Sequence, residues 1–233
     1  LGDLLVADPR VRKVSFTGST GVGERIAAHA GVKKLSLELG ASCPVVIMPD
    51  ADLELAAGAV AAGGFANAGQ VCISVQRVIA HPAINDDFLD ALLPKVKAIR
   101  TGDPGSAETT MGTLITTAEA ERVQESIAAA AKAGARVLIG GERDGAVVAP
   151  TVVADVDPSS PFSQDELFGP AVAVSKADDW ESAIAQANGT AFGLAAGIFT
   201  SDLAGAIRGI REIDAGNIHI NWTPLWRADL MPY

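Results

Sequence analysis

Cys72 and Glu38 are the two side chains best placed by the sequence to do chemistry. Cys72 follows Gly69 and Gln70, in a loop between an Ala/Gly-rich helix and a strand, where a thiol can be presented to a substrate. A nucleophilic thiol needs activation, because free cysteine has a pKa of about 8.5. Glu38 ends a strand, and strand carboxyl ends commonly carry chemistry in α/β sheets. The alternatives are a small buried hydrophobe for Cys72 and a solvated strand residue for Glu38.

A glycine-rich turn, Phe16–Gly23, follows a predicted strand and opens a predicted helix. Such a turn can bring backbone N–H groups to a phosphate, with help from the helix dipole. The glycines at 18, 21 and 23 do not fit G-x-G-x-x-G. The segment is not a P-loop either, because Glu24 stands where the lysine is required. From the motif alone, a phosphate site and a plain glycine turn are equally good interpretations.

The elements that position these residues alternate between strand and helix periodicity. The alternation predicts an α/β fold with a mainly parallel sheet flanked by helices. The predicted strands are 11–16, 34–39, 45–48, 73–80, 137–139, 147–156, 172–174, 196–199 and 217–220. The predicted helices are 21–30, 52–65, 86–99, 118–133, 180–187 and 203–213.

Composition excludes several classes of function. The chain has 233 residues, 48% of them hydrophobic, which suits a folded globular protein. Its net charge of −10 argues against nucleic acid and anionic membranes as partners. The uncharged stretch from Leu55 to Gln76 is mostly Ala and Gly, and we interpret it as a buried helix and its exit loop. Two cysteines and no recognisable signal peptide predict a cytoplasmic location.

The histidines do not form a metal site, because His29, His81 and His219 lack the spacing of ligands. Composition leaves open a Cys-His hydrolase that pairs Cys72 with His81 or His219. That alternative does not explain the glycine turn or the segment around Glu166.

Four motifs in order resemble the aldehyde dehydrogenase superfamily. They are Phe16–Gly23, Leu37–Gly40, Gly69–Cys72 and Glu166–Pro170. The final Met231–Tyr233 also looks like the substrate loop of that family. The resemblance covers nearly the whole chain and is far more specific than any one of its motifs.

This resemblance implies covalent oxidation of a small-molecule aldehyde with NAD or NADP. Cys72 would attack the aldehyde to give a thiohemiacetal, and loss of hydride to the cofactor would leave a thioester. Glu38 would activate the water that hydrolyses it, which suits a carboxylate whose pKa is raised by a partly desolvated pocket.

The resemblance also assigns a cofactor site. Gly18 and Ser19 would open the helix at the pyrophosphate, in the turn that Gly23 completes. Glu166 would hold the nicotinamide ribose, Phe168 would pack near the nicotinamide, and the Leu39 carbonyl would lie by its carboxamide. The substrate residues would be Trp226, Arg227 and Tyr233, with a surface loop as an equal alternative for Arg227. Cys43 departs from the family pattern and is predicted to be a buried filler.

The resemblance divides the chain into three parts. Residues 1–40 would be the end of the cofactor-binding domain, 41–220 the catalytic domain, and 221–233 the substrate loop with the start of a returning segment. Full-length members carry further cofactor-binding residues upstream and a subunit-pairing strand downstream, and they form homo-oligomers. A second hypothesis is therefore a non-catalytic fragment, which folds or assembles but lacks a complete cofactor site.

Overall fold

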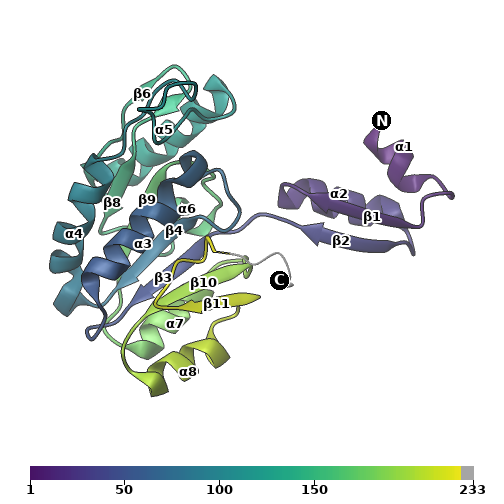
Figure 1. Ribbon diagram of the computed structural model, residues 1–233. Helices are drawn as coiled ribbons and strands as arrows, with labels where there is room; N and C mark the ends of the chain where they lie inside the picture. Colours follow the sequence, from purple (N-terminus) through teal and green to yellow (C-terminus); the bar gives the residue numbers. More distant parts are fainter. Residues whose placement is uncertain (227–233) are drawn as a thin grey trace. The chain divides into compact units, whose positions relative to one another are not determined.

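The structure, a computed structural model, describes residues 1–226 and divides into two compact units, Leu1–Gly40 and Ala41–Tyr233 (Figure 1). The smaller unit contains α1 (Gly2–Ala7), β1 (Lys13–Thr17), α2 (Thr20–Ala30) and β2 (Lys34–Glu38). Strands β1 and β2 pair in parallel, so that Val14 lies opposite Leu35 and Phe16 opposite Leu37. This strand–helix–strand unit places the glycine turn at the end of β1 and Glu38 at the end of β2.

The larger unit is built on a seven-stranded sheet. Its spatial order is β11 (Asn217–Ile220), β10 (Ala195–Phe199), β3 (Cys43–Ile47), β4 (Val75–Ala80), β9 (Ala171–Lys176), β8 (Thr151–Ala154) and β5 (Arg136–Ile139). All neighbouring pairs are parallel except β5 with β8. The prediction of an α/β fold with a mainly parallel sheet is therefore confirmed. A short antiparallel pair, β6 (Arg143–Asp144) with β7 (Val147–Val148), lies outside this sheet.

Helices cover both faces of the sheet (Figure 1). They are α3 (Leu53–Phe65), the 3₁₀ turn η1 (Ala66–Gly69), α4 (Pro82–Lys97), α5 (Thr117–Lys132), α6 (Pro161–Gln164), α7 (Trp180–Asn188) and α8 (Leu203–Glu212). Successive residues of β3 point to opposite faces. Val45 and Ile47 join the core beneath α3, α4 and α5, whereas Val46 and Met48 join the core beneath α7. Burial on both faces explains why β3 is apolar throughout.

The uncharged stretch is a buried helix and its exit loop, as predicted. Asp52 caps α3 by accepting a hydrogen bond from the Leu55 N–H over 3.0 Å. Val60 and Phe65 of this helix are buried in the main core. Among the described residues, no helix is both long enough and apolar enough to cross a membrane.

The prediction of a single strand over 147–156 is wrong. The structure has two short strands there, β7 and β8, separated by Ala149 and Pro150. A proline has no N–H for a ladder bond, so it breaks the pairing at this point. Helices α1 and α6 and strand β6 are further short elements that periodicity does not predict.

A carboxylate joins the ends of two strands at the carboxyl edge of the sheet. Asp50, just after β3, accepts hydrogen bonds from the Thr200 hydroxyl at 2.9 Å and from the Ser201 N–H and hydroxyl at 2.8 Å each. Burial by itself would raise the pKa of Asp50, but the hydrogen bonds from Ser201 and Thr200 outweigh it and hold the pKa below its usual value. Asp50 thereby ties the ends of β3 and β10 together.

Candidate active site

The candidate residues of the larger unit gather at the amino edge of its sheet. Strands β3, β4 and β9 are adjacent and parallel, so their amino ends meet at one edge. Cys72 lies shortly before β4, and Glu166 and Phe168 lie shortly before β9. Ala41 and Ser42 come directly before β3. The topology therefore brings together three loops that lie far apart in the sequence.

The loop that leads to Cys72 has an uncommon backbone. Asn67, Ala68 and Gly69 all have positive φ, at 51°, 55° and 71°. Left-handed backbone costs free energy at a residue with a Cβ, and surrounding contacts must hold such a residue in place. Ala68 is buried, and Asn67 is held by a hydrogen bond from its side-chain amide to the Gln70 carbonyl at 3.2 Å. The turn sets the direction from which the chain reaches Cys72.

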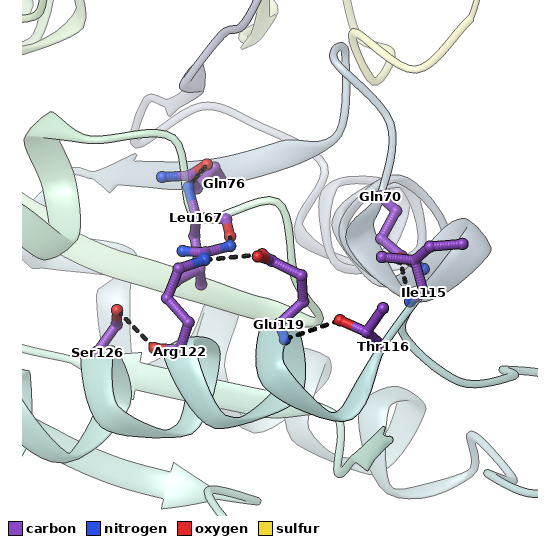
Figure 2. Close-up of polar contacts among 8 residues, drawn as sticks. All are labelled: Gln70, Gln76, Ile115, Thr116, Glu119, Arg122, Ser126 and Leu167. Atoms are coloured by element: carbon purple, nitrogen blue, oxygen red, sulfur yellow. Dashed lines mark hydrogen bonds and ion pairs between the residues drawn. The ribbon is translucent and has the colours of Figure 1, made fainter. Parts of the chain in front are cut away.

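Gly69 and Gln70 fix this loop to its neighbours. A Cβ at Gly69 would collide with the Gly169 carbonyl, so the two backbones approach as only glycine allows. The Gln70 side-chain amide donates to the Thr113 carbonyl at 3.2 Å. Its oxygen accepts from the Ile115 N–H at 2.9 Å (Figure 2). The segment before Cys72 is thus bound on one side to the Glu166 loop and on the other to the residues before α5.

The two cysteines have different surroundings. Cys72 is half-buried and packs with Val71, Leu194 and Leu225 around a small cluster that contains Cys43. The Cys43 side chain is only 1% exposed, as predicted for a filler. Burial raises the pKa of the Cys43 thiol to about 12. Cys43 is therefore a neutral thiol at physiological pH, and Cys72 is the cysteine that a reagent can reach.

Glu166 and its neighbour Leu167 are held by partners from three parts of the chain. Its carboxylate accepts a hydrogen bond from the Ala41 N–H over 3.0 Å. Next to it, the Leu167 N–H donates to the Gln76 side chain at 2.9 Å, and the Leu167 carbonyl accepts from Arg122 at 2.6 Å (Figure 2). Arg122 in turn donates to Glu119 at 2.8 Å on the same helix. These contacts set the orientation of the Glu166 loop.

The surroundings of Glu166 suit a group that binds a polar ligand. Burial raises the pKa of Glu166, while the Ala41 N–H and the charge of Arg122 act in the opposite direction. Glu166 lines a cavity of about 360 Å³ between α5 and α6, with Arg122 and Phe162 in its walls. Phe168, two residues on, has a φ of 50° and a side chain that is 41% exposed. A carboxylate and an exposed aromatic ring therefore belong to one fixed loop.

Arg77 anchors the amino edge from within the sheet. Its guanidinium is buried and donates to the Ser42 carbonyl, and to the Gln186 and Ala187 carbonyls at 2.8 and 3.0 Å. Burial lowers the pKa of Arg77 to about 10. The group therefore stays charged at neutral pH, and its N–H groups are satisfied by backbone carbonyls.

The smaller unit contains the glycine turn and Glu38. The Gly18 N–H donates to the Glu38 carbonyl over 3.0 Å, which joins the two strand ends. Gly23 is buried, and a Cβ there would meet the Leu39 side chain, so this glycine allows α2 to pack on Leu39. The side chain of Ser19, the residue before α2, makes no capping hydrogen bond. The Glu38 side chain is exposed.

The segment after β11 returns over the sheet to the cysteine cluster. Thr223 is buried close to Gly63 of α3, and Leu225 packs against the same small cluster as Cys72. The Trp226 side chain is 49% exposed, and its ring meets the edge of the His219 ring at a centroid distance of 6.1 Å. Two other predicted substrate residues, Arg227 and Tyr233, lie outside the described residues, as does Met231. Within residues 1–226, no cluster of three or more His, Cys, Asp or Glu could hold a metal ion.

Sequence reasoning missed the residues that hold the site together. They are Ala41, Gln76, Arg77 and Arg122. A signal for two of them was present, because Gln76 and Arg77 are polar residues inside an otherwise apolar strand. Buried polar side chains need hydrogen-bond partners, so such a pair indicates anchoring contacts.

The larger unit thus has a mostly parallel sheet, and its amino edge carries the half-buried Cys72 and a fixed loop with the carboxylate of Glu166. The aldehyde dehydrogenase family model matches residues 1–233. The chain belongs to the aldehyde dehydrogenase family.

Individual relatives agree with this assignment. The chain is 41% identical over its whole length to the 3-sulfolactaldehyde dehydrogenase of Priestia megaterium, of which it covers 49%. It is 37% identical, with a TM-score of 0.97, to the glyceraldehyde-3-phosphate dehydrogenase of Methanocaldococcus jannaschii solved with NADP, and covers 50% of that chain. The structure of an NAD-dependent aldehyde dehydrogenase from Sinorhizobium meliloti is 38% identical to this chain, with a TM-score of 0.93. The match covers 95% of this chain and 45% of the Sinorhizobium meliloti chain. The chain thus spans about half the length of the relatives it matches.

Proposed function

We propose that this chain provides the nucleophile and part of the cofactor site for NAD(P)-dependent oxidation of an aldehyde to a carboxylic acid. One observation carries the proposal. The loop that presents Cys72 and the loop that presents Glu166 are fixed to each other. The backbones of Gly69 and Gly169 are in close contact, and the Gln76 side chain hydrogen-bonds to the residues on either side of Glu166. A nucleophile and a cofactor ligand must keep such a fixed relation for the bound groups to react.

In the proposed reaction, the Cys72 thiolate attacks the aldehyde carbon and forms a thiohemiacetal. When bound, NAD or NADP would supply a hydride acceptor for that carbon. The product on the enzyme is then a thioester of Cys72. Glu38 takes a proton from a water molecule as that water attacks the thioester, which releases the acid and returns Cys72 as a thiolate.

The residues present fit a dinucleotide. The first N–H groups of α2 have no acceptor within the helix, and Ser19 does not cap them, so they can meet a pyrophosphate. Glu166 is one of the residues that line a cavity of about 360 Å³, and its carboxylate would accept hydrogen bonds from the ribose. Phe168 offers an exposed ring beside it for a nicotinamide. Leu39, directly after Glu38, would present its carbonyl to the carboxamide.

The substrate side of the proposal rests on the segment after β11. Trp226, together with Arg227 and Tyr233, would line the path of the aldehyde. Three of the relatives are named 3-sulfolactaldehyde, lactaldehyde and betaine aldehyde dehydrogenase. The aldehydes in these names are small, and each is polar or charged. A cation at Arg227 would favour an anionic aldehyde.

The test is the formation of reduced cofactor when the chain is mixed with an aldehyde and NAD or NADP. We expect Cys72→Ala to abolish turnover, and turnover that persists in this variant would contradict the assignment of the nucleophile. The same measurement is made on a hybrid in which this chain replaces the matching half of the Priestia megaterium relative. Turnover by the hybrid, but not by the chain alone, would favour the second hypothesis of a fragment that lacks a complete cofactor site.

A further inference from the structure

Gln76 binds the loop that carries Glu166, although no step of the proposed reaction uses Gln76. It sits on β4, four residues after Cys72, and is only 7% exposed. Burial of a primary amide without partners costs free energy, so its hydrogen bonds show what this side chain does.

Both ends of the Gln76 carboxamide bind the loop that carries Glu166. Its N–H donates to the Asp165 carbonyl over 2.6 Å, and its oxygen accepts from the Leu167 N–H over 2.9 Å. One planar group therefore spans the residues on either side of Glu166. Two hydrogen bonds in one plane limit rotation of the loop about its chain axis, whereas a single hydrogen bond would allow that rotation.

The other side-chain and loop contacts next to Glu166 differ from that of Gln76. Within this loop, Arg122 binds the Leu167 carbonyl and the Ala41 N–H binds the Glu166 carboxylate, so each holds a single group. The Ala41 contact would be weakened whenever the carboxylate turned toward a ligand. The carboxamide of Gln76 is thus a side-chain contact that binds both neighbours of Glu166, and it can hold the Glu166 backbone while the Glu166 side chain binds something else.

We propose that Gln76 is a positioning residue that sets the Glu166 carboxylate at a fixed place relative to Cys72. The inference rests on the proposed function, in which Glu166 binds the ribose of the cofactor and Cys72 binds the aldehyde. Cys72 and Gln76 belong to the same continuous segment, so this segment fixes both reactants. A shift of about 1 Å in such an arrangement can lower a rate by about a hundredfold.

Three variants test the proposal. Gln76→Leu removes both hydrogen bonds at similar volume. Gln76→Glu keeps the acceptor for the Leu167 N–H but places a carboxylate against the Asp165 carbonyl. Gln186→Leu is the matched control, because the Gln186 side chain also makes two hydrogen bonds. Its partners are the Ser175 hydroxyl at 3.0 Å and the Lys176 carbonyl at 2.7 Å, at the carboxyl end of β9.

The first measurement is amide hydrogen exchange in the chain itself. We expect exchange at Leu167 to accelerate at least tenfold in Gln76→Leu and to stay unchanged in Gln186→Leu, because the acceptor of that N–H is lost only in the first. The rate at which iodoacetamide labels Cys72 should be the same in all variants. Unchanged exchange at Leu167 in Gln76→Leu would overturn the proposal.

The second measurement is steady-state kinetics in the hybrid enzyme. We expect the KM for NAD(P) to rise between about tenfold and a hundredfold in Gln76→Leu, with little change in the KM for the aldehyde. In Gln76→Glu the cofactor KM, taken relative to the parent at each pH, should fall as the pH is lowered, because a protonated glutamic acid donates to the Asp165 carbonyl. A merely structural role would change both KM values alike, or neither, and would overturn the proposal.

Failure of the inference is distinguishable from failure of the proposed function. Turnover that survives Cys72→Ala, or a cofactor KM that is unchanged in Glu166→Gln, would contradict the proposed function. A cofactor KM that responds to Glu166→Gln and not to Gln76→Leu would contradict only the role of Gln76.

Discussion

The Cys43 thiol donates a hydrogen bond to the backbone carbonyl of Cys72 over 3.5 Å. The first residue of β3 therefore touches the backbone of the proposed nucleophile, while its own sulfur is buried. This pairing places a chemically inert thiol beside the one that the proposal makes reactive, and it allows a direct comparison of the two.

We predict that iodoacetamide at pH 8 labels Cys72 and leaves Cys43 unlabelled in the folded chain. With a pKa of about 12, the Cys43 thiol is roughly one part in ten thousand thiolate at that pH. Peptide mass spectrometry after brief labelling measures both sites in one sample. Labelling in denaturant is the control, in which both cysteines should react. Equal labelling of the two cysteines in the folded chain would contradict the prediction.

We predict that Glu38→Gln, in a protein that turns over, gives a burst of reduced cofactor and then stalls. The burst remains because formation of the thioester does not need the base, whereas its hydrolysis does. Loss of a general base lowers the steady-state rate by about a hundredfold or more. Rapid-mixing absorbance of the reduced cofactor separates the two phases.

The control for this experiment is Glu24→Gln, an exposed carboxylate on α2 with no proposed role. Addition of hydroxylamine, which attacks thioesters, should restore steady turnover in Glu38→Gln. A steady state equal to that of the parent would remove Glu38 from the role of base.

We predict that Gly69→Ala lowers the free energy of unfolding by about 2 to 4 kcal/mol. The new methyl group would meet the Gly169 carbonyl, and a φ of 71° is costly for alanine. Gly58→Ala is the control, because Gly58 lies in α3 with open space around it. That change should raise stability by about 0.5 to 1 kcal/mol. Urea denaturation measures both, and similar values for the two variants would refute the prediction.

We predict that Asp50→Asn destabilises the chain by about 1 to 3 kcal/mol at pH 7, because the hydrogen bonds to Thr200 and Ser201 are weakened. The pKa of Asp50 is lowered by folding, so its contribution is fully present above the unfolded value of about 3.9 and is lost as the pH falls through the folded value. The difference between parent and variant should therefore shrink below about pH 4.

Chemical denaturation across this pH range provides the measurement. Asp202→Asn is the matched control, since Asp202 caps α8 and asparagine caps a helix about as well as aspartate. A difference between parent and Asp50→Asn that stays constant with pH would rule out the charged form as the stabilising species.

Periodicity predicted most of the fold because the central strands β3, β4, β8, β9 and β10 are buried on both faces, and because the helices are either amphipathic or rich in small residues. It failed at 147–156, where the apolar run continues through Pro150 but the hydrogen bonding between strands is interrupted, because proline has no N–H to donate. The motifs placed Cys72 and Glu166 on loops. They gave no indication that the two loops touch, since the Gly69 to Gly169 approach and the bonds of Gln76 join residues about 90 to 100 positions apart. Such contacts depend on which strands are neighbours in the sheet, and the local pattern of apolar residues in a sequence does not specify the order of the strands.

The hydrogen bonds of Asp50 lie at the carboxyl edge of the same sheet whose amino edge carries Cys72 and Glu166. Protein engineers can use this separation. Substitutions around Asp50, Thr200 and Ser201 should change how much folded protein survives heat, while leaving the kinetic constants of the molecules that remain folded unchanged. Thermal tolerance can then be selected through substitutions at the carboxyl edge of the sheet. Substrate preference can be selected in a separate round at the amino edge.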